Sequence, residues 1–488
     1  MDGAEAARRV LAETSCVRGR RVVGACAPAA VGAGLAIFCQ GGNAFDAAVA
    51  ACLVEAVALP MKCGLGGDLV ALVRTQGGPI RALVSVGPGV AALAQGAQLS
   101  RVGPRSVGVP GAPDGYAALA ASGRLGLEAL VAPAVRAAED GVEWTPLAVQ
   151  LTQEAESLLR THNQDIPFLP EQRLPRVGER LRLPALAALL RSFGHSGGEL
   201  FFGDEGAALA QRLEASGGLL RADDLRVRPA RWSAAERLPL PDDASLWVTP
   251  VPTHGPSLLR AVELAHLGED DPITAVLRAR TESGQDRHGS AGAGTSVVSA
   301  ADDESNAVVV VHSNSFAQYG SGVVAEEWDL VLNNRPGYGF DIDAPVNTPN
   351  APAAGRLPMT TLHAWALEKR EATLFGATPG GANQMPWNLQ TVLACLAGDD
   401  DLGRNVVAPR WGMDEAGQVV CEADHAFAER DGVDVAPPLS LRSAEQVLCV
   451  AADTPYVQLV ADPRIGARVG AVPLAESAAA EAPRDAEG

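Results

Sequence analysis

Lysine is almost absent from this chain. Among 488 residues there are only two lysines, Lys62 and Lys369, so arginine carries nearly all of the basic charge. Acidic residues also outnumber basic ones, 58 against 39, which gives a formal net charge of −19 at pH 7. Nucleic acid and anionic membrane surfaces would be repelled by such a chain. The composition therefore predicts a small-molecule substrate and excludes nucleic acid or a membrane as the main partner.

The chain also lacks the segments expected of an exported, membrane-spanning or disulfide-rich protein. It has no run of about 18 apolar residues, and its first 21 residues contain acidic side chains and no apolar signal core. Its eight cysteines form no C-x-x-C pair and have no histidines at metal-ligand spacing. We therefore expect a cytoplasmic protein with no metal site and no cofactor.

The chain is rich in apolar residues, which make up 47% of it, and this content is ample for a buried core. Residues 41–60 predict one buried helix, opened by a Gly-Gly-Asn cap and closed by Pro60. A glycine-rich turn then precedes a strand. A dinucleotide or phosphate site would need the opposite order, a strand followed by a glycine-rich turn and a helix, so we do not expect such a site here. Further helices are expected within 113–139 and 205–219, and a strand, loop and helix within 245–267.

The segment 281–294, "TESGQDRHGSAGAG", has almost no large apolar side chain. Burial cannot offset the entropy of ordering it, so we expect it to be mobile. An interdomain linker is the ordinary interpretation. The segment ends, however, at Thr295, which begins a predicted hairpin of two strands, "SVVSA" and "VVVVHSN".

A threonine placed at a strand start suggests a second interpretation, in which the chain is cut between Gly294 and Thr295. The new α-amine would titrate near 7.7 to 8.0 and could act as the base for the Thr295 hydroxyl. Gly294 would tolerate the strained backbone from which that hydroxyl attacks. Gly380 and Gly381 in "GATPGGANQ" could then offer backbone N–H groups to an oxyanion, although a plain turn explains them equally well.

Several segments resemble the γ-glutamyltranspeptidase family of N-terminal-nucleophile hydrolases. They include "GGNAFDAAVA", "GVPGAPDGYAAL", "VTPVPTHGPS", "LVLNNR" and "GATPGGANQ". The resemblance implies an α+β fold, a four-layer αββα sandwich. It places the nucleophile on Thr295, its hydrogen-bonding hydroxyl on Ser313 and the oxyanion glycines on Gly380 and Gly381.

The resemblance also implies a division of the chain. Residues 1–294 would form a large piece that ends in the mobile stretch, and residues 295–474 a small piece, followed by a disordered tail at 475–488. The two pieces would stay associated after the cut. Pairing of two such units into a homodimer is left open.

The groups that recognise a glutamyl head in the family are replaced here. Val84 stands where an arginine would hold the α-carboxylate, and Arg81, three residues earlier, should lie on the opposite face of the strand. Arg335 and Tyr338 replace the Gln and Asp that receive the α-amine. Of a pair of pocket serines only the hydroxyl of Thr360 remains. The candidates for contacting a substrate are therefore Arg335, Tyr338, Thr360 and Asn314.

Because the catalytic groups persist while the glutamyl-binding groups are lost, we predict an active hydrolase with a new, carboxylate-bearing substrate held by Arg335. The pattern is similar to a branch of the family in bacterial specialised metabolism, in pathways to 4-alkylproline units of antibiotics, which implies hydrolysis of a C–C bond beside a carbonyl. Two alternatives remain open. One is a conventional γ-glutamyl hydrolase or transferase, and the other is an unprocessed scaffold or binding protein.

Overall fold

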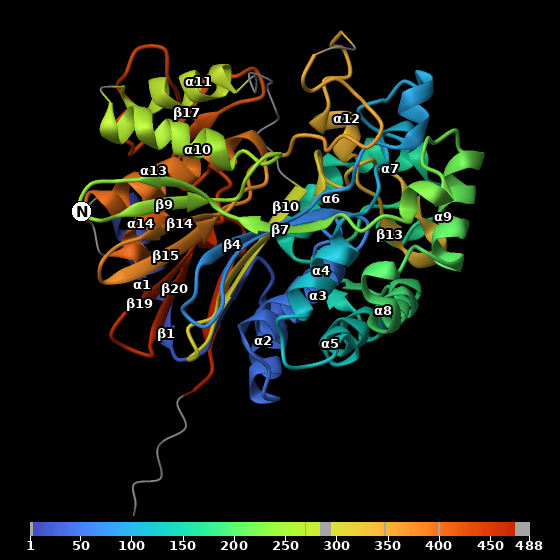
Figure 1. The fold of residues 1–488 in the computed structure, drawn as a ribbon, viewed down its shortest axis with the longest axis horizontal. Helices are drawn as coiled ribbons and strands as arrows, with labels where there is room; N and C mark the ends of the chain where they lie inside the picture. The colour runs from blue at the N-terminus through green and yellow to red at the C-terminus, as the bar shows by residue number, and fades with distance from the viewer. Residues whose placement is uncertain (1–2, 269, 284–293, 346–347, 399–400, 474–488) are drawn as a thin grey trace, which may run out of the picture.

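Two seven-stranded antiparallel sheets form the centre of the protein (Figure 1). The computed structural model describes residues 3–268, 270–283, 294–345, 348–398 and 401–473. Sheet A runs in the order β1 (Cys16–Gly19), β20 (Val457–Ala461), β19 (Gln446–Ala451), β15 (Ala372–Ala377), β14 (Trp365–Glu368), β9 (Ser245–Val248) and β8 (Glu236–Pro239). Sheet B runs in the order β21 (Arg468–Ala471), β2 (Val22–Ala25), β10 (Gly294–Ala301), β11 (Ala307–Ser315), β3 (Asp68–Arg74), β4 (Ile80–Ser85) and β7 (Ala230–Ala234).

Helices cover the outer face of each sheet. An apolar cluster joins sheet B to α2 (Pro28–Cys39), α3 (Ala44–Ala58), α4 (Ala112–Ala120), α5 (Leu127–Asp140), α6 (Pro146–Glu154) and α8 (Pro184–Ser196). A second cluster joins sheet A to α10 (Gly255–Val262), α11 (Pro272–Glu282), α13 (Gln384–Leu396) and α14 (Leu402–Val407). The remaining helices are α1 (Gly3–Thr14), α7 (Glu156–His162), α9 (Asp204–Ala215) and α12 (Arg335–Gly339).

A third apolar cluster lies between the two sheets and contains side chains of both, such as Val297 and Val309 of sheet B and Phe375 of sheet A. The order of layers is therefore helix, sheet, sheet, helix, which confirms the predicted four-layer αββα sandwich. Strands β10 and β11 are buried along their whole length. Their valine-rich sequences suit this position, because both faces of these strands are covered.

The sheets mix strands from before and after residue 294. In sheet B, β2 pairs with β10 and β3 with β11. In sheet A, β1 pairs with β20 and β9 with β14. In Figure 1 the blue and green strands of sheet A lie beside orange and red ones, and the blue strands of sheet B lie beside yellow ones. A cut at residue 294 would therefore leave both pieces joined by hydrogen-bonded strand pairs.

Most local predictions are confirmed. Helix α3 is entirely buried except at its last residue, and Asn43 caps it by accepting hydrogen bonds from two N–H groups of its first turn. The predicted hairpin is β10–β11, in which Thr295 lies opposite Ser313. The predicted strand, loop and helix of 245–267 are β9 and α10, followed by a turn of π-helix at Glu263–Leu267.

The segment predicted to be mobile is described only at its two ends. Helix α11 continues through Glu282, whose carboxylate pairs with Arg260 at 2.7 Å. Gly294 is already the first residue of β10. Residues 284–293, and the predicted disordered tail at 475–488, lie outside the described residues. In the described parts of the chain, no helix combines the length and apolar character needed to cross a membrane.

Candidate active site

Thr295 and Ser313 lie side by side at the start of β10 and the end of β11. The Thr295 hydroxyl donates a hydrogen bond of 3.2 Å to Ser313 Oγ. Ser313 Oγ in turn donates to the carbonyl oxygen of Gly294 at 2.5 Å and accepts from the N–H of Ser315 at 2.9 Å. The chain runs on through the Gly294–Thr295 peptide, so the hydroxyl proposed as nucleophile and the carbonyl it would attack are linked through one serine.

Asp68 extends this pair into a row across three strands. Strand register places Thr295 opposite Ser313, and Ser313 opposite Asp68 of β3. Residues directly opposite in antiparallel strands project to the same face of a sheet. Val297 and Val311, each two residues away from the row, belong to the cluster between the sheets, so the row faces sheet A.

Arg335 forms a buried ion pair with Asp68. Its Nε lies 3.1 Å from the Asp68 carboxylate, which also accepts from the N–H groups of Gly87 and Gly111. Burial raises the pKa of Asp68 and lowers the pKa of Arg335, while their mutual attraction opposes both shifts. Arg335 Nη2 is buried and has no hydrogen-bond partner among the described residues. Within the described part of the chain, the guanidinium therefore keeps the two N–H groups of Nη2 without a partner beside the row.

Gly380 and Gly381 form the turn between β15 and α13. Both have positive φ, 148° and 56°, and a Cβ on Gly380 would lie 2.4 Å from the ring of Trp387. Glycine is therefore required at position 380. Ala377, at the end of β15, lies opposite Gln446, whose Nε2 donates to the carbonyl of Val297 at 2.8 Å. This connection brings the turn to the end of the sandwich where Thr295 lies.

The other predicted contact residues have the following local contacts. Asn314 is buried next to Ser313, and its Nδ2 donates to Pro60 while its Oδ1 has no partner among the described residues. Tyr338 packs on Phe316, with ring centroids 4.8 Å apart. The Thr360 hydroxyl accepts from the N–H of Leu362 at 3.2 Å, a contact that leaves its own O–H as a donor.

Val84 and Arg81, the positions compared above with the glutamyl-binding arginine, lie in β4. Val84 is buried in the apolar cluster between the sheets. Arg81 is exposed, and its guanidinium lies 4.9 Å from the centroid of the Trp232 ring. The expectation that Arg81 lies on the other face of the strand from Val84 is thus confirmed.

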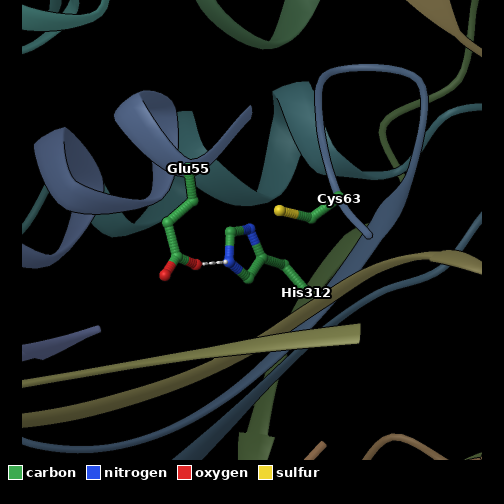
Figure 2. Close-up of side chains that lie close together, drawn as sticks. All are labelled: Glu55, Cys63 and His312. Carbon is green, nitrogen blue, oxygen red and sulfur yellow. Dashed lines mark hydrogen bonds and ion pairs between the residues drawn. The ribbon is translucent and has the colours of Figure 1, made fainter. Parts of the chain in front are cut away.

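Behind β11, on the face opposite Ser313, lies a group that sequence analysis missed. Figure 2 shows Glu55 of α3, Cys63 and His312 converging in the interior. His312 Nε2 and Glu55 Oε2 are 2.8 Å apart, and His312 Nδ1 lies 2.8 Å from the hydroxyl of Tyr116. The ligand atoms of Glu55, Cys63 and His312 lie within 4.8 Å of one another. A metal could bind there only by displacing one of these hydrogen bonds, because both imidazole nitrogens are already engaged.

Asp68 also escaped notice in the sequence, although a signal existed. It is the only charged residue in the otherwise apolar stretch "GLGGDLVALV". A lone acid at the start of a buried strand needs a partner. Its partner Arg335 is 267 residues away in the sequence, so only the folded structure could identify it.

The two stacked sheets between helical layers, with a threonine at the start of a central strand, define the class of N-terminal-nucleophile hydrolases. The cephalosporin acylase of Bacillus halodurans has the same fold, with a TM-score of 0.78 and 26% identity over 93% of this chain and 96% of that one. The γ-glutamyltranspeptidase family model matches residues 30–270 and 269–434. The chain belongs to that family.

Two curated relatives show how the similarity is distributed. The acylase ACY 1 proenzyme of Pseudomonas sp. (strain V22) is 34% identical over 217 residues, which cover 41% of this chain but only 39% of the acylase. The oxamate amidohydrolase proenzyme of Klebsiella pneumoniae is 27% identical over 437 residues, which cover 77% of this chain and 82% of the relative.

Proposed function

We propose that this protein is a self-processing hydrolase in which Thr295 first cuts the chain at Gly294 and then serves as the N-terminal nucleophile. The observation that carries the proposal is the double role of Ser313, which accepts a hydrogen bond from Thr295 and donates one to the Gly294 carbonyl. The family relatives named as proenzymes support it. The products would be a piece of residues 1–294 and a piece that begins at Thr295.

In the cut, Thr295 Oγ would attack the Gly294 carbonyl carbon. The hydrogen bond from Ser313 stabilises the negative charge that develops on the carbonyl oxygen. The C–N bond breaks, the nitrogen takes up the hydroxyl proton, and the acyl group is left as an ester on Thr295. Water then hydrolyses this ester, which releases the carboxylate of Gly294 and restores the Thr295 hydroxyl beside a free α-amine.

In each catalytic cycle the free α-amine would accept the proton of the Thr295 hydroxyl as this hydroxyl attacks the substrate carbonyl. The N–H groups of Gly380 and Gly381 would hold the resulting oxyanion. The leaving group takes the proton from the α-amine and departs, and water releases the acyl group in a second step. The same sequence hydrolyses an amide or, if the departing carbanion is stabilised, a C–C bond beside a carbonyl.

The substrate we propose is a small carboxylate-bearing metabolite, made or used in a biosynthetic pathway. Arg335 Nη2 has no partner in the described segments of the chain, and a guanidinium is well suited to a carboxylate. Asn314, Thr360 and Tyr338 would complete the pocket. Burial of Val84 between the sheets argues against glutamyl recognition at that position.

A denaturing gel of the purified protein tests the first step. Two fragments, with the smaller one starting at Thr295 by N-terminal sequencing, would support processing. A single band at the full 50.3 kDa would instead favour an unprocessed binding protein. The processed protein is then assayed on oxamate, other small carboxylate amides, 2-keto acids and γ-glutamyl anilide. Preference for the anilide would favour the conventional γ-glutamyl enzyme.

A further inference from the structure

Lys62 lies in the turn between α3 and β3 and is one of the two lysines of the chain. Lys62 is buried, with 1% of its surface exposed. Its backbone is fixed on both sides, since its N–H donates to Leu59 and its carbonyl accepts from the N–H of Asn314, each at 2.8 Å. Asn314 follows Ser313 directly. The backbone of Lys62 is therefore fixed against the residue that follows Ser313, one of the two proposed catalytic hydroxyl residues.

Lys62 Nζ has no hydrogen-bond partner among the described residues. The carboxylate of Glu55, in the neighbouring helix, forms no ion pair with Lys62 among the described residues, and its oxygens are instead in contact with His312 and with the N–H groups of Cys26 and Ala27. The other lysine, Lys369, is half-buried and donates to the carbonyl of Cys395. A buried, unpaired amine costs stability, and such costs are concentrated at functional sites.

Lys62 lines a cavity of about 10 Å³, together with Pro379, Gly380 and Arg442 and the apolar residues Leu147, Leu151 and Ile465. This volume has room for about one water-sized group, such as a single oxygen atom. Arg442 brings a second positive charge, but both of its terminal nitrogens bind the carboxylate of Glu154, at 3.1 and 2.7 Å. The charge of Arg442 is thus balanced within the protein. Among the described residues that line this cavity, Lys62 offers a charged donor without a hydrogen-bond partner, and Gly380, one of the glycines proposed to hold the oxyanion, lines the same cavity.

We propose that Lys62 binds an anionic oxygen of the substrate in this cavity. The oxygen could belong to a substrate carboxylate or to the oxyanion formed at the attacked carbonyl, and both present the same chemistry to an ammonium group. This assignment rests on the proposed function. Lys62 would be a further residue of the pocket, distinct from Val84, Arg335, Tyr338 and Thr360, which stand at the glutamyl-binding positions of the family.

Two lysines allow a binding test that needs no catalysis. Protein labelled with [ε-13C]lysine gives two side-chain signals, which the Lys369→Met variant assigns. The test uses the Thr295→Ala variant and titrates acetate, malonate and oxamate. We expect the Lys62 signal to shift saturably with at least one of them while the Lys369 signal stays constant. A Lys62 signal that is indifferent to all three, or that shifts only in parallel with Lys369, would overturn the assignment.

Kinetics on the processed protein distinguish the two sources of the anionic oxygen. Lys62→Met should lower kcat/KM by about a hundredfold, as expected for the loss of a charged contact, and Lys62→Arg should restore part of it. A fall in kcat alone indicates the oxyanion, and a rise in KM alone indicates a carboxylate. Lys369→Met is the matched control and should stay within about twofold of wild type. Unchanged kcat and KM in folded, processed Lys62→Met would refute the proposal.

The outcome is separable from that of the proposed function. If Thr295→Ala were still cut at Gly294, the account of processing would fail, yet a saturable shift of the Lys62 signal would still show an anion at Lys62. If Thr295→Ala stays uncut and the Lys62 signal does not respond, the assignment of Lys62 fails alone.

Discussion

Two neighbouring groups of buried polar side chains at one end of sheet B differ in charge and in hydrogen bonding. At the junction of β10 and β11, Thr295, Ser313 and Gly294 are neutral, and Ser313 Oγ both donates and accepts hydrogen bonds. One strand further, Asp68 and Arg335 are charged, and Arg335 Nη2 is left without a partner among the described residues. In the first region the hydroxyls are hydrogen-bonded within the protein. In the second, Arg335 Nη2 has no partner among the described residues.

This difference suggests that the neutral region takes part in the reaction and that the charged region binds the substrate. Neutral hydroxyls can be buried with short hydrogen bonds at modest cost, and they can therefore be held in a fixed arrangement before any substrate arrives. A buried charge is costlier and gains most from a further ionic partner. We infer that the hydroxyl region is set up for reaction and the charged region for binding an anion. The following predictions test this division.

The largest effect is expected at Thr295. Thr295→Ala removes the attacking oxygen, so the protein should remain one full-length band on a denaturing gel and show no activity. Thr295→Ser, which keeps the hydroxyl, should still be cut. Cleavage at the same bond in the alanine variant would show that another group performs the cut.

Removing the Ser313 hydroxyl should slow the cut without abolishing it. Ser313→Ala takes away the donor to the Gly294 carbonyl, and the loss of such a donor typically lowers a rate by about a hundredfold to a thousandfold. A time course of band intensities after refolding measures this rate. Ser315→Ala is a suitable control, because the contacts of Ser315 to Ser313 are made by its backbone N–H and carbonyl groups. An unchanged rate in Ser313→Ala would contradict the role assigned to this serine.

Glutathione and γ-glutamyl anilides should be poor substrates of the processed wild-type protein. The absence of a buried carboxylate partner typically costs about 2 to 5 kcal/mol, or roughly a 30-fold to several-thousand-fold loss of affinity. Val84→Arg should not rescue them, because position 84 lies in the apolar layer between the sheets and the amine-binding positions also differ. A kcat/KM of about 10⁴ M⁻¹s⁻¹ on the anilide, an ordinary enzyme value, would reinstate the conventional transferase.

Breaking the ion pair should affect binding more than chemistry. Arg335→Ala removes the free Nη2 and should raise KM by about tenfold while kcat changes less, the pattern of a uniform binding contact. It also leaves Asp68 buried without its cation, so the free energy of unfolding should fall by about 3 kcal/mol. Denaturant unfolding of Arg335→Ala and of Arg335→Ala with Asp68→Asn separates the two effects. An unchanged KM would place Arg335 outside the site.

The smallest effect concerns pH and His363, near Thr360. Burial lowers the pKa of His363 to about 4, and its two ring nitrogens bind Thr361 and Asn388. The unfolded chain therefore binds a proton more readily than the folded one. Stability should be full above about pH 6.5 and fall by about 1 kcal/mol per pH unit on acidification toward pH 4. His363→Gln should reduce this dependence without abolishing it, because burial also lowers the pKa of His254. The exposed His195→Gln should leave it unchanged. An unaltered slope in His363→Gln would contradict the assignment.

Much of the architecture was predictable from the sequence, because the signals are local. The Asn43 cap and the apolar run of α3, and the valine-rich strands of the β10–β11 hairpin, are patterns read within a few residues. The hairpin alone places Thr295 near Ser313, since the two residues are 18 positions apart on paired strands. The family resemblance supplied the αββα order of layers and the glycine turn.

Only the tertiary structure decided what surrounds these groups. Strands β3 and β11, which are far apart in the sequence, pair with a register that places Asp68 opposite Ser313, and the pairing of Asp68 with Arg335 follows from the same packing. The burial of Lys62 beside Gly380 likewise depends on sheet A closing over sheet B. Local sequence fixes the conformation of a segment through its own side chains, whereas the partner of a buried charge is fixed by which distant segment fills the adjacent space.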